Sequence, residues 1–287
     1  MGLLNWVNGI FKNSESVQVP FIGISRHRIV TDGDGVTTLV AFHGCELNCK
    51  YCLNPQSLQT NGVWRKFTPQ SLLQAVLIDN LYFDETGGGI CFGGGEPLMH
   101  TEFIKAFKSI CPNSWKISVE TSLNVSKSSL IEIADFVDSY IVDIKDMNPF
   151  IYSAYTGKDN SKVKENLRWL VANGLSDRIT IRTPLIPSFN TQSDVDLSVA
   201  ELKSMGFMNF ENLTYITERH KKDSTIEEIV GKATCFYLKN IRIDVAKRQG
   251  IAYSPKECTH KGPCAGTCPV CDNELKCLNQ LIYQRIN

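Results

Sequence analysis

The chain has 287 residues, of which 43% are hydrophobic and 21% charged, as in ordinary globular proteins large enough for one big domain and a small appendage. Lysine plus arginine and aspartate plus glutamate both number 30, so the net charge is zero and indicates neither a nucleic-acid nor an anionic-membrane partner. No stretch of the sequence approaches the roughly 18 uncharged apolar residues of a membrane-spanning helix.

Residues 1–20 are expected to form an N-terminal helix or arm. Apolar side chains recur there at helical spacing, at Leu3, Leu4, Val7, Ile10 and Phe11. This pattern favours a short helix packed on the main body, and an amphipathic helix on a membrane surface is the alternative. The basic flank and cleavage site of a secretory signal are lacking, so we expect a cytoplasmic protein.

Residues 21–220 are predicted to form one α/β domain, because short apolar runs alternate with amphipathic stretches. The candidate strands are residues 36–43, 88–92, 116–120, 139–145, 179–186 and 212–217. The candidate helices between them are residues 69–81, 101–110, 126–137, 161–174 and 193–206. A repeat of about 30 residues matches a βα unit. Such alternation predicts a parallel sheet, either in a barrel or in a doubly wound fold.

Residues 221–287 are predicted to form a C-terminal extension. Residues 224–240 have a helical pattern, and residues 241–253 are expected to be strand-like or extended. Residues 254–277 are polar and rich in glycine, proline and cysteine, so they cannot build a core unaided. We expect a bound metal or cluster to stabilise them.

The eleven cysteines are unevenly placed, with three at residues 45–52 and five at residues 258–277. A disulfide framework would spread them more evenly through a smaller secreted fold. Two tight groups instead predict two metal sites in a reducing cytosol. The isolated cysteines, Cys91, Cys111 and Cys235, are interpreted as small buried residues.

The first group, Cys45, Cys49 and Cys52, directly follows the first predicted strand of the α/β repeat. Ligands of parallel α/β proteins bind where loops leave the carboxyl ends of the strands, so the position suits chemistry. Three thiolates on a [4Fe–4S] cluster leave one iron open to another ligand. A structural zinc site completed by His43 is the alternative.

Polar residues and glycines follow the next strands. Gly93, Gly94 and Gly95 let the backbone approach a ligand closely, and Glu96 could accept a hydrogen bond from an ammonium group. Residues two apart share one face of a strand, which pairs Ser118 with Glu120, Asp143 with Lys145 and Thr180 with Arg182. These groups either form salt bridges at strand ends or line a barrel mouth that holds a charged ligand.

The cysteine spacing CxxxCxxC, followed in order by GGGEP, resembles the radical S-adenosylmethionine (SAM) enzymes. The stretches TDGDGVTTLVAFHGCELNCKYCLNPQS and YIVDIKDMNPFIYSAYTGKDNSKVKENLRWL are similar to the glycyl-radical-enzyme activating proteins. The similarity covers roughly residues 20–217. It implies a partial (β/α)6 TIM-type barrel, here with a small C-terminal iron–sulfur segment.

The resemblance also implies the cofactors and their contacts. Cys45, Cys49 and Cys52 would hold a [4Fe–4S] cluster whose open iron binds SAM, with Tyr51 over the adenine. It places Gly93, Gly94, Gly95 and Glu96 at the methionyl group. Lys145 and Arg182 would lie near the SAM carboxylate or ribose. Glu120, Thr121 and Asp143 would lie near a monovalent cation.

The chemistry implied is reductive cleavage of SAM to a 5′-deoxyadenosyl radical, which removes hydrogen from a substrate. The substrate favoured is a glycyl residue of a partner glycyl radical enzyme, with a low-potential electron donor of flavodoxin or ferredoxin type. One alternative is an enzyme with an auxiliary cluster that modifies or oxidises a peptide or small molecule. A non-catalytic iron–sulfur or zinc scaffold is the other.

The second group has no counterpart in the short activating proteins. Its members are Cys258, Cys264, Cys268, Cys271 and Cys277. Four of these five thiolates would close a second [4Fe–4S] cluster. The alternative is a zinc knuckle built on the Cys268–Cys271 pair.

Overall fold

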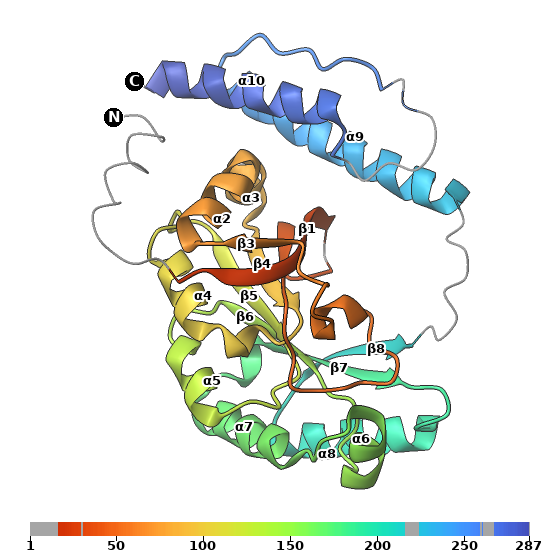
Figure 1. Ribbon diagram of the computed structural model, residues 1–287. Helices are drawn as coiled ribbons and strands as arrows, with labels where there is room; N and C mark the ends of the chain where they lie inside the picture. The colour runs from red at the N-terminus through yellow and green to blue at the C-terminus, as the bar shows by residue number, and fades with distance from the viewer. Residues whose placement is uncertain (1–16, 30, 216–223, 259, 261–266, 287) are drawn as a thin grey trace.

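A computed structural model describes residues 17–29, 31–215, 224–258, 260 and 267–286. Its centre is an eight-stranded sheet of order β3-β1-β2-β4-β5-β6-β7-β8. Six consecutive strands run parallel: β2 (Val36–Phe42), β4 (Gly89–Gly94), β5 (Lys116–Thr121), β6 (Ser139–Asp143), β7 (Ile179–Leu185) and β8 (Asn209–Thr214). In the described part of the chain the sheet stays open at β3 and β8 (Figure 1). The predicted partial (β/α)6 barrel is therefore confirmed.

The helices that cover the sheet occur where the sequence predicts them. They are α2 (Pro69–Val76), α3 (Asn80–Thr86), α4 (Thr101–Lys108), α5 (Lys127–Ile133), α7 (Ser161–Ala172) and α8 (Gln192–Met205). Capping boxes at Thr68 and Thr191 start α2 and α8. The single helix predicted over residues 69–81 is divided by a 3-10 turn, η2 (Leu77–Asp79), and α6 (Pro149–Thr156) was not predicted.

Two antiparallel strands precede and extend the repeat, and the sequence prediction missed both. β1 (Val19–Ile29) pairs with β2 and with β3 (Arg65–Phe67). Pro20 and Gly23 weaken the strand pattern of β1, and β3 has only three residues. Because β1 begins at Val19, the barrel starts slightly before the expected boundary at residue 21. The helix expected in the N-terminal arm falls on residues 1–16, outside the described residues.

The connection from β1 to β2 lies at the amino ends of the parallel strands. The Ser118 hydroxyl donates to the Asp32 carbonyl at 2.9 Å. Gly33 and Asp34 also line a cavity of about 140 Å³ together with the first residues of three strands, Gly89, Lys116 and Ser139. Residues 31–35 thus cover the end of the barrel opposite to the predicted site.

The C-terminal extension consists of two long helices, α9 (Ser224–Arg248) and α10 (Pro269–Ile286), which lie over α3 (Figure 1). A second apolar core joins them to the barrel and contains Leu238, Val245, Leu275 and Leu278 together with Val36, Leu81 and Tyr82. No helix among the described residues is long and apolar enough to cross a membrane.

One expectation about the extension was wrong. Residues 241–248 continue α9 instead of forming an extended segment, because Leu238, Arg242 and Val245 share one buried helical face. Ile241, Ile243 and Val245 alternate with polar residues as they would in a strand, which explains the wrong prediction. Residues 254–277 include the start of α10, whose Leu275 is buried in a core that is shared with α9 and the barrel.

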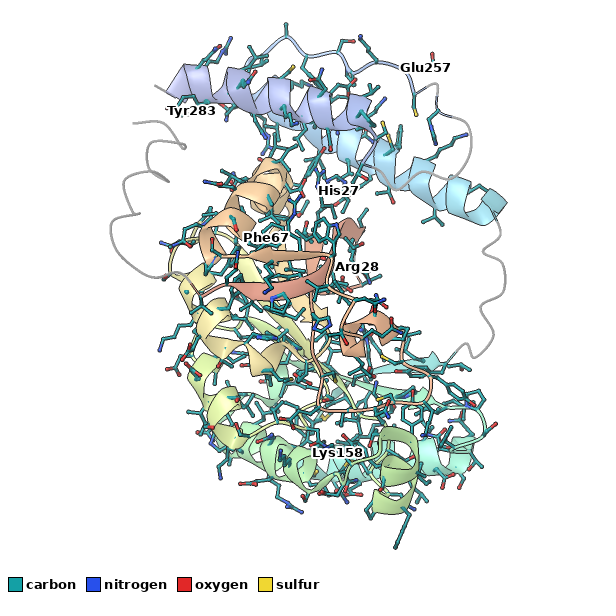
Figure 2. All side chains as sticks on the ribbon, viewed as in Figure 1. His27, Arg28, Phe67, Lys158, Glu257 and Tyr283 are labelled. Carbon is teal, nitrogen blue, oxygen red and sulfur yellow. The ribbon has the colours of Figure 1, made fainter. Side chains whose placement is uncertain are left out.

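A buried carboxylate links the sheet to this extension. Asp79 in η2 is completely buried and accepts hydrogen bonds from Arg26 at 2.7 and 2.8 Å and from His27 at 2.9 Å. Arg26 also forms an ion pair with Asp272 of α10 at 2.9 Å. Figure 2 shows His27 between the sheet and the C-terminal helices. Burial acts to raise the pKa of Asp79, but the hydrogen bonds and charges of Arg26 and His27 outweigh it and lower this pKa.

Asp79→Asn is expected to reduce the free energy of unfolding by about 3–5 kcal/mol, because it leaves the Arg26 charge without its buried partner. The folded-state pKa of Asp79 is below its unfolded value of about 3.9. Its stabilisation is therefore complete above that value and is lost as the pH falls through the folded-state pKa. Urea unfolding at pH 7 and at a series of acidic pH values measures both effects. The exposed Asp84→Asn is the control, and equal stabilities of the two variants would contradict the prediction.

Candidate active site at the carboxyl ends of the strands

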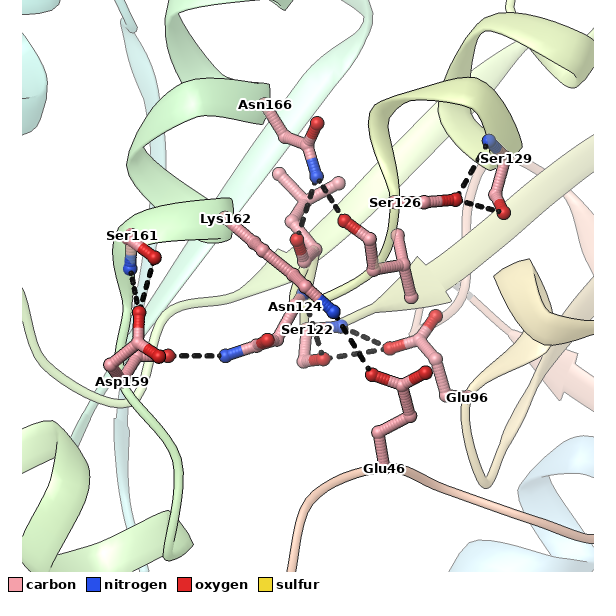
Figure 3. Close-up of polar contacts among 12 residues, drawn as sticks. Glu46, Glu96, Ser122, Asn124, Ser126, Ser129, Asp159, Ser161, Lys162 and Asn166 are labelled. Atoms are coloured by element: carbon pink, nitrogen blue, oxygen red, sulfur yellow. Dashed lines mark hydrogen bonds and ion pairs between the residues drawn. The ribbon is translucent and has the colours of Figure 1, made fainter.

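The predicted cysteine loop leaves the carboxyl end of β2 and is fixed at both sides by its backbone. Gly44 N–H donates to the Ser57 carbonyl at 2.9 Å, beside η1 (Pro55–Leu58). On the other side, Asn48 N–H donates to the Thr156 carbonyl at 2.9 Å and Lys50 N–H to the Tyr155 carbonyl at 3.1 Å. An ion pair between Lys162 of α7 and Glu46 adds a surface contact (Figure 3). The three thiols are thereby held in one short, anchored loop.

Cys45, Cys49 and Cys52 are all partly exposed and form no disulfide. Burial raises the pKa of Cys45 to about 12. Burial also raises the pKa of Cys49 to about 11, although the nearby charge of Lys145 opposes this shift. Both thiols are therefore neutral near pH 7 unless a cation displaces their protons. The ring Nε2 of His43 donates to the Gln59 carbonyl at 2.8 Å, so the geometry gives no support to a zinc site completed by this histidine.

The glycine-rich turn after β4 packs directly against the base of the cysteine loop. Gly95 N–H donates to the Phe42 carbonyl at 2.9 Å, and Glu96 N–H to the Gly44 carbonyl at 2.8 Å. Gly94 has φ +90°, and a Cβ at Gly95 would lie 2.0 Å from the Gly44 carbonyl oxygen. Glycine is therefore required here for contact between two backbone segments. A Cβ at Gly93 would approach Glu120 Oε2 to 3.0 Å.

Glu96 joins this turn to the residues after β5. Its Oε1 accepts from the Thr121 hydroxyl at 2.6 Å and from Leu98 N–H at 3.2 Å. Its Oε2 accepts from the Ser122 hydroxyl at 2.7 Å and from Ser122 N–H at 3.0 Å (Figure 3). Burial raises the pKa of Glu96 although these hydrogen bonds oppose the shift. Four donors fill the roughly four lone-pair positions of a carboxylate, so an ammonium group must displace one of them.

Lys145 lies just beyond β6 and is almost completely buried. Its ammonium forms an ion pair with Asp143 and donates to the Tyr215 hydroxyl at 2.8 Å. Burial acts to lower the pKa of Lys145, but the charge of Asp143 outweighs it and the pKa is raised. The second oxygen of Asp143, Oδ1, is buried and has no hydrogen-bond partner among the described residues.

Arg182 of β7 connects three parts of the barrel. Its guanidinium donates to Glu120 of β5 at 2.9 Å, to Glu211 of β8 at 2.7 Å and to the Thr31 carbonyl at 2.7 Å. Burial, followed by the nearby charge of Asp143, raises the pKa of Glu120. The structure thus brings together the two carboxylates predicted near a cation, whereas the hydroxyl of the third residue, Thr121, is engaged by Glu96.

Tyr51 belongs to a group of aromatic rings beside the cysteine loop. Its ring centroid lies 5.7 Å from Phe189 and 6.2 Å from Tyr155, and Tyr155 in turn lies 6.2 Å from Tyr215. The residues of the site that sequence reasoning missed are Ser122, Tyr155, Phe189, Glu211 and Tyr215. The signal that could have found most of them is position, since Ser122, Phe189 and Tyr215 follow the carboxyl ends of β5, β7 and β8.

The second cysteine group lies on the C-terminal extension, away from this site. Cys268 and Cys271 are at the start of α10, Cys258 is exposed on the segment before it, and Cys264 lies outside the described residues. Cys277 is on the exposed side of α10. Cys235 of α9 is buried as expected, but its sulfur is 3.5 Å from that of Cys271.

Comparison with known proteins matches residues 39–197 to the radical SAM superfamily. The pyruvate formate-lyase-activating enzyme of Clostridium pasteurianum is 28% identical over 165 residues, 58% of this chain and 68% of that protein. The pyruvate formate-lyase 2-activating enzyme of Escherichia coli K12 is 29% identical over 206 residues, 59% of this chain and 70% of that protein. A solved domain of pyruvate-formate lyase-activating enzyme from Bacteroides vulgatus aligns with 54% of this chain and 94% of its own, with 27% identity and a TM-score of 0.40.

Proposed function

The chain belongs to the radical SAM superfamily, and from this membership we propose that it activates a partner enzyme by removing a hydrogen atom from a backbone glycine. The observation that carries the proposal is the anchored loop with Cys45, Cys49 and Cys52 beside the buried Glu96 turn. When bound, a [4Fe–4S] cluster supplies one electron to the sulfonium of SAM, which yields methionine and a 5′-deoxyadenosyl radical. The curated relatives named above activate pyruvate formate-lyase.

The residues present fit these cofactors. Three thiols without disulfides suit three irons of a cluster and leave the fourth iron to SAM. SAM carries an amino group, a carboxylate and a sulfonium, and the site offers charges of both signs in Lys145, Arg182, Glu120 and Asp143. The orphaned Asp143 Oδ1 would accept a hydrogen bond from SAM or contact a monovalent cation. Tyr51 would cover the adenine ring.

The protein residues have positioning roles in this proposal, because hydrogen abstraction by a radical needs no nucleophile or general base from the protein. Glu96 fixes the turn after β4 against the loop after β5, and Lys145 is oriented by Asp143 and Tyr215. The aromatic rings around Tyr51 would shield this side of the loop from water when the cofactors are bound. A low-potential donor of flavodoxin or ferredoxin type would supply the electron.

The proposal is tested with the anaerobically reconstituted full chain, SAM, dithionite and a glycyl radical protein encoded near its gene. We expect release of 5′-deoxyadenosine and an electron paramagnetic resonance doublet from the partner. The doublet should collapse to a singlet when the partner carries α-deuterated glycine, since the splitting comes from the remaining glycine α-hydrogen. Release of 5′-deoxyadenosine without any partner radical would contradict the assignment of a glycyl substrate.

A second candidate function is modification or oxidation of a peptide or small molecule with help from an auxiliary cluster. The observation that favours it is the C-terminal extension, whose cysteine-bearing helices lie outside the residues matched by the family model. A short precursor peptide encoded beside the gene that changes mass in the same reaction would support this function. Whether the extension binds iron, zinc or no metal would separate the two functions further.

A further inference from the structure

Helix α9 has two apolar faces, and only one of them is covered by the rest of the described chain. The covered face carries Leu238, Arg242 and Val245, which pack against α3 and α10. The other face exposes five large apolar side chains, namely Ile229, Val230, Phe236, Tyr237 and Ile243. Ile229 and Phe236 have exposed fractions of 62% and 67%. A contiguous apolar face of this kind on a surface helix indicates a binding surface.

The exposed face of α9 has the spacing of a coiled-coil seam. One set of residues recurs at intervals of seven, namely Ile229, Phe236 and Ile243. A second set lies four residues beyond the first and is also exposed, namely Ala233, Asn240 and Lys247. The alternation of four and three residues defines one stripe along the helix, with the first set at the d positions of a heptad and the second set at the a positions. The side chains of such a stripe fit between those of a helix lying alongside, so the occupant that matches this face is another helix.

Asn240, within the stripe, indicates that the second helix is an identical one. In a parallel pair of identical helices, each a residue meets its own equivalent, and each d residue does the same. The two Asn240 amides then face each other, and each satisfies the other because an amide has both donors and an acceptor. Against an apolar residue of an unrelated helix, the same amide would lose its hydrogen bonds to water without replacement. An Asn at an a position specifies register and oligomer state in parallel dimers.

The charges beside the stripe favour the parallel orientation. The g positions next to it include Lys232 and Lys239, and the e positions include Asp244. In a parallel pair, Lys239 lies beside Asp244 of the second copy, and the two-fold axis repeats this contact. In an antiparallel pair the g positions face each other, so that lysines would meet lysines at a cost in free energy. The Lys239 ammonium also donates to the Lys256 carbonyl, and its three donors allow both contacts.

We propose that α9 pairs with α9 of a second copy of this chain as a short parallel coiled coil. The seam from Ile229 to Lys247 is about 28 Å long at a rise of about 1.5 Å per residue. It contains fewer than three heptads, so two isolated peptides of this length would associate poorly. In this chain α9 is already held by its core with Leu275 and Leu278 of α10, so pairing does not have to drive helix formation. Because the interface is small, we expect a dissociation constant in the micromolar range.

The paired helices lie between the two barrels in this dimer. Phe236 and Leu238 point about 200° apart around the helix axis, so the seam faces away from the core that joins α9 to its own barrel. That core contains Val36 at the start of β2, whereas the cysteine loop follows the other end of the same strand. Pairing through α9 therefore leaves the candidate active site of each copy accessible. The inference does not depend on the proposed glycyl substrate.

The test is the mass of the anaerobically reconstituted full chain in solution, measured by sedimentation equilibrium under reducing conditions from about 1 to 200 μM. We expect a reversible equilibrium between monomer and dimer for the wild type. Phe236→Glu should weaken dimerisation at least about tenfold, because two like charges then meet within the seam. Leu197→Glu is the matched control, since Leu197 of α8 has the same exposed fraction of 67%, and it should dimerise like the wild type. Equal circular dichroism and equal urea midpoints report that all three proteins are folded.

Opposite charges at residue 240 test the orientation of the two helices. Asn240→Lys and Asn240→Glu should each dimerise at least about tenfold more weakly than the wild type, whereas an equimolar mixture should recover dimers, because residue 240 meets its own equivalent only in the parallel pair. A mixture that associates no better than either variant would overturn the parallel orientation. A wild type with the mass of one chain at every concentration would overturn the proposal, as would equal weakening by Leu197→Glu. Binding of a monomeric wild type to vesicles of anionic phospholipid, abolished in Phe236→Glu, would assign the face to a membrane surface instead.

Discussion

Replacing Cys52 by alanine is expected to lower the release of 5′-deoxyadenosine by at least about a thousandfold, because two remaining thiolates cannot hold a cluster that requires three. Cys45 and Cys49 stay in the same anchored loop, and the backbone hydrogen bonds of Gly44, Asn48 and Lys50 do not involve the lost sulfur. The protein should therefore fold normally and bind little iron at this site. Iron content and SAM cleavage with dithionite measure the two effects.

Cys111→Ala is the matched control, since it also removes a thiol. Cys111 is buried just after α4, about 60 residues along the chain from the cysteine loop. Its thiol donates to the Lys108 carbonyl. The control should lose some stability through a small cavity and keep its iron and its activity. Cleavage of SAM by Cys52→Ala at the rate of the wild type would refute the assignment of this loop.

Glu96→Gln is expected to raise the KM for SAM about tenfold or more while the bound iron stays unchanged. An amide places an NH2 group where one carboxylate oxygen accepts hydrogen bonds. The Thr121 hydroxyl can rotate to accept, but Leu98 N–H and Ser122 N–H cannot. One buried N–H then faces another donor, at a cost of about 1–3 kcal/mol. The turn after β4 should move relative to the loop after β5, which displaces any ligand between them.

Two measurements separate this positioning effect from general instability. The KM for SAM and the kcat are determined together with the urea midpoint. Thr121→Ser is the control, because it keeps the hydroxyl that donates to Glu96 and removes only a methyl group. We expect it to have a KM close to that of the wild type. A wild-type KM in Glu96→Gln would show that the four hydrogen bonds of this carboxylate have no part in binding SAM.

The barrel could be predicted from the sequence because each βα unit repeats the same local pattern at a similar spacing. The carboxyl ends of parallel strands meet at one edge, so Cys49, Glu96 and Lys145 could be brought together without any coordinates. The partners of these residues were less predictable. That Arg182 reaches Glu120, Glu211 and the Thr31 carbonyl depends on side-chain reach across three strands, which spacing along the chain does not encode.

The C-terminal extension shows where sequence patterns are insufficient. Cys235 stands alone in the sequence, and its sulfur comes within 3.5 Å of that of Cys271 only because α9 packs against α10. The helical spacing of Cys235, Leu238 and Arg242 was the available signal, but the β-branched residues that follow Cys235 suggested a strand. A group of five cysteines close in sequence drew attention to Cys277, which tertiary packing places on the exposed side of α10.

Residues 31–35 have a consequence for the order of events in the barrel. Asp32 accepts a hydrogen bond from Ser118 near the amino end of β5, and the Thr31 carbonyl accepts one from Arg182 within β7, so this segment covers the barrel on the side away from the cysteine loop. In the proposed function, a polypeptide that inserts from the cysteine side would lie over the molecule bound beneath it. We therefore expect SAM to bind before the polypeptide and its products to leave after it, so that the lifetime of the polypeptide complex would limit turnover.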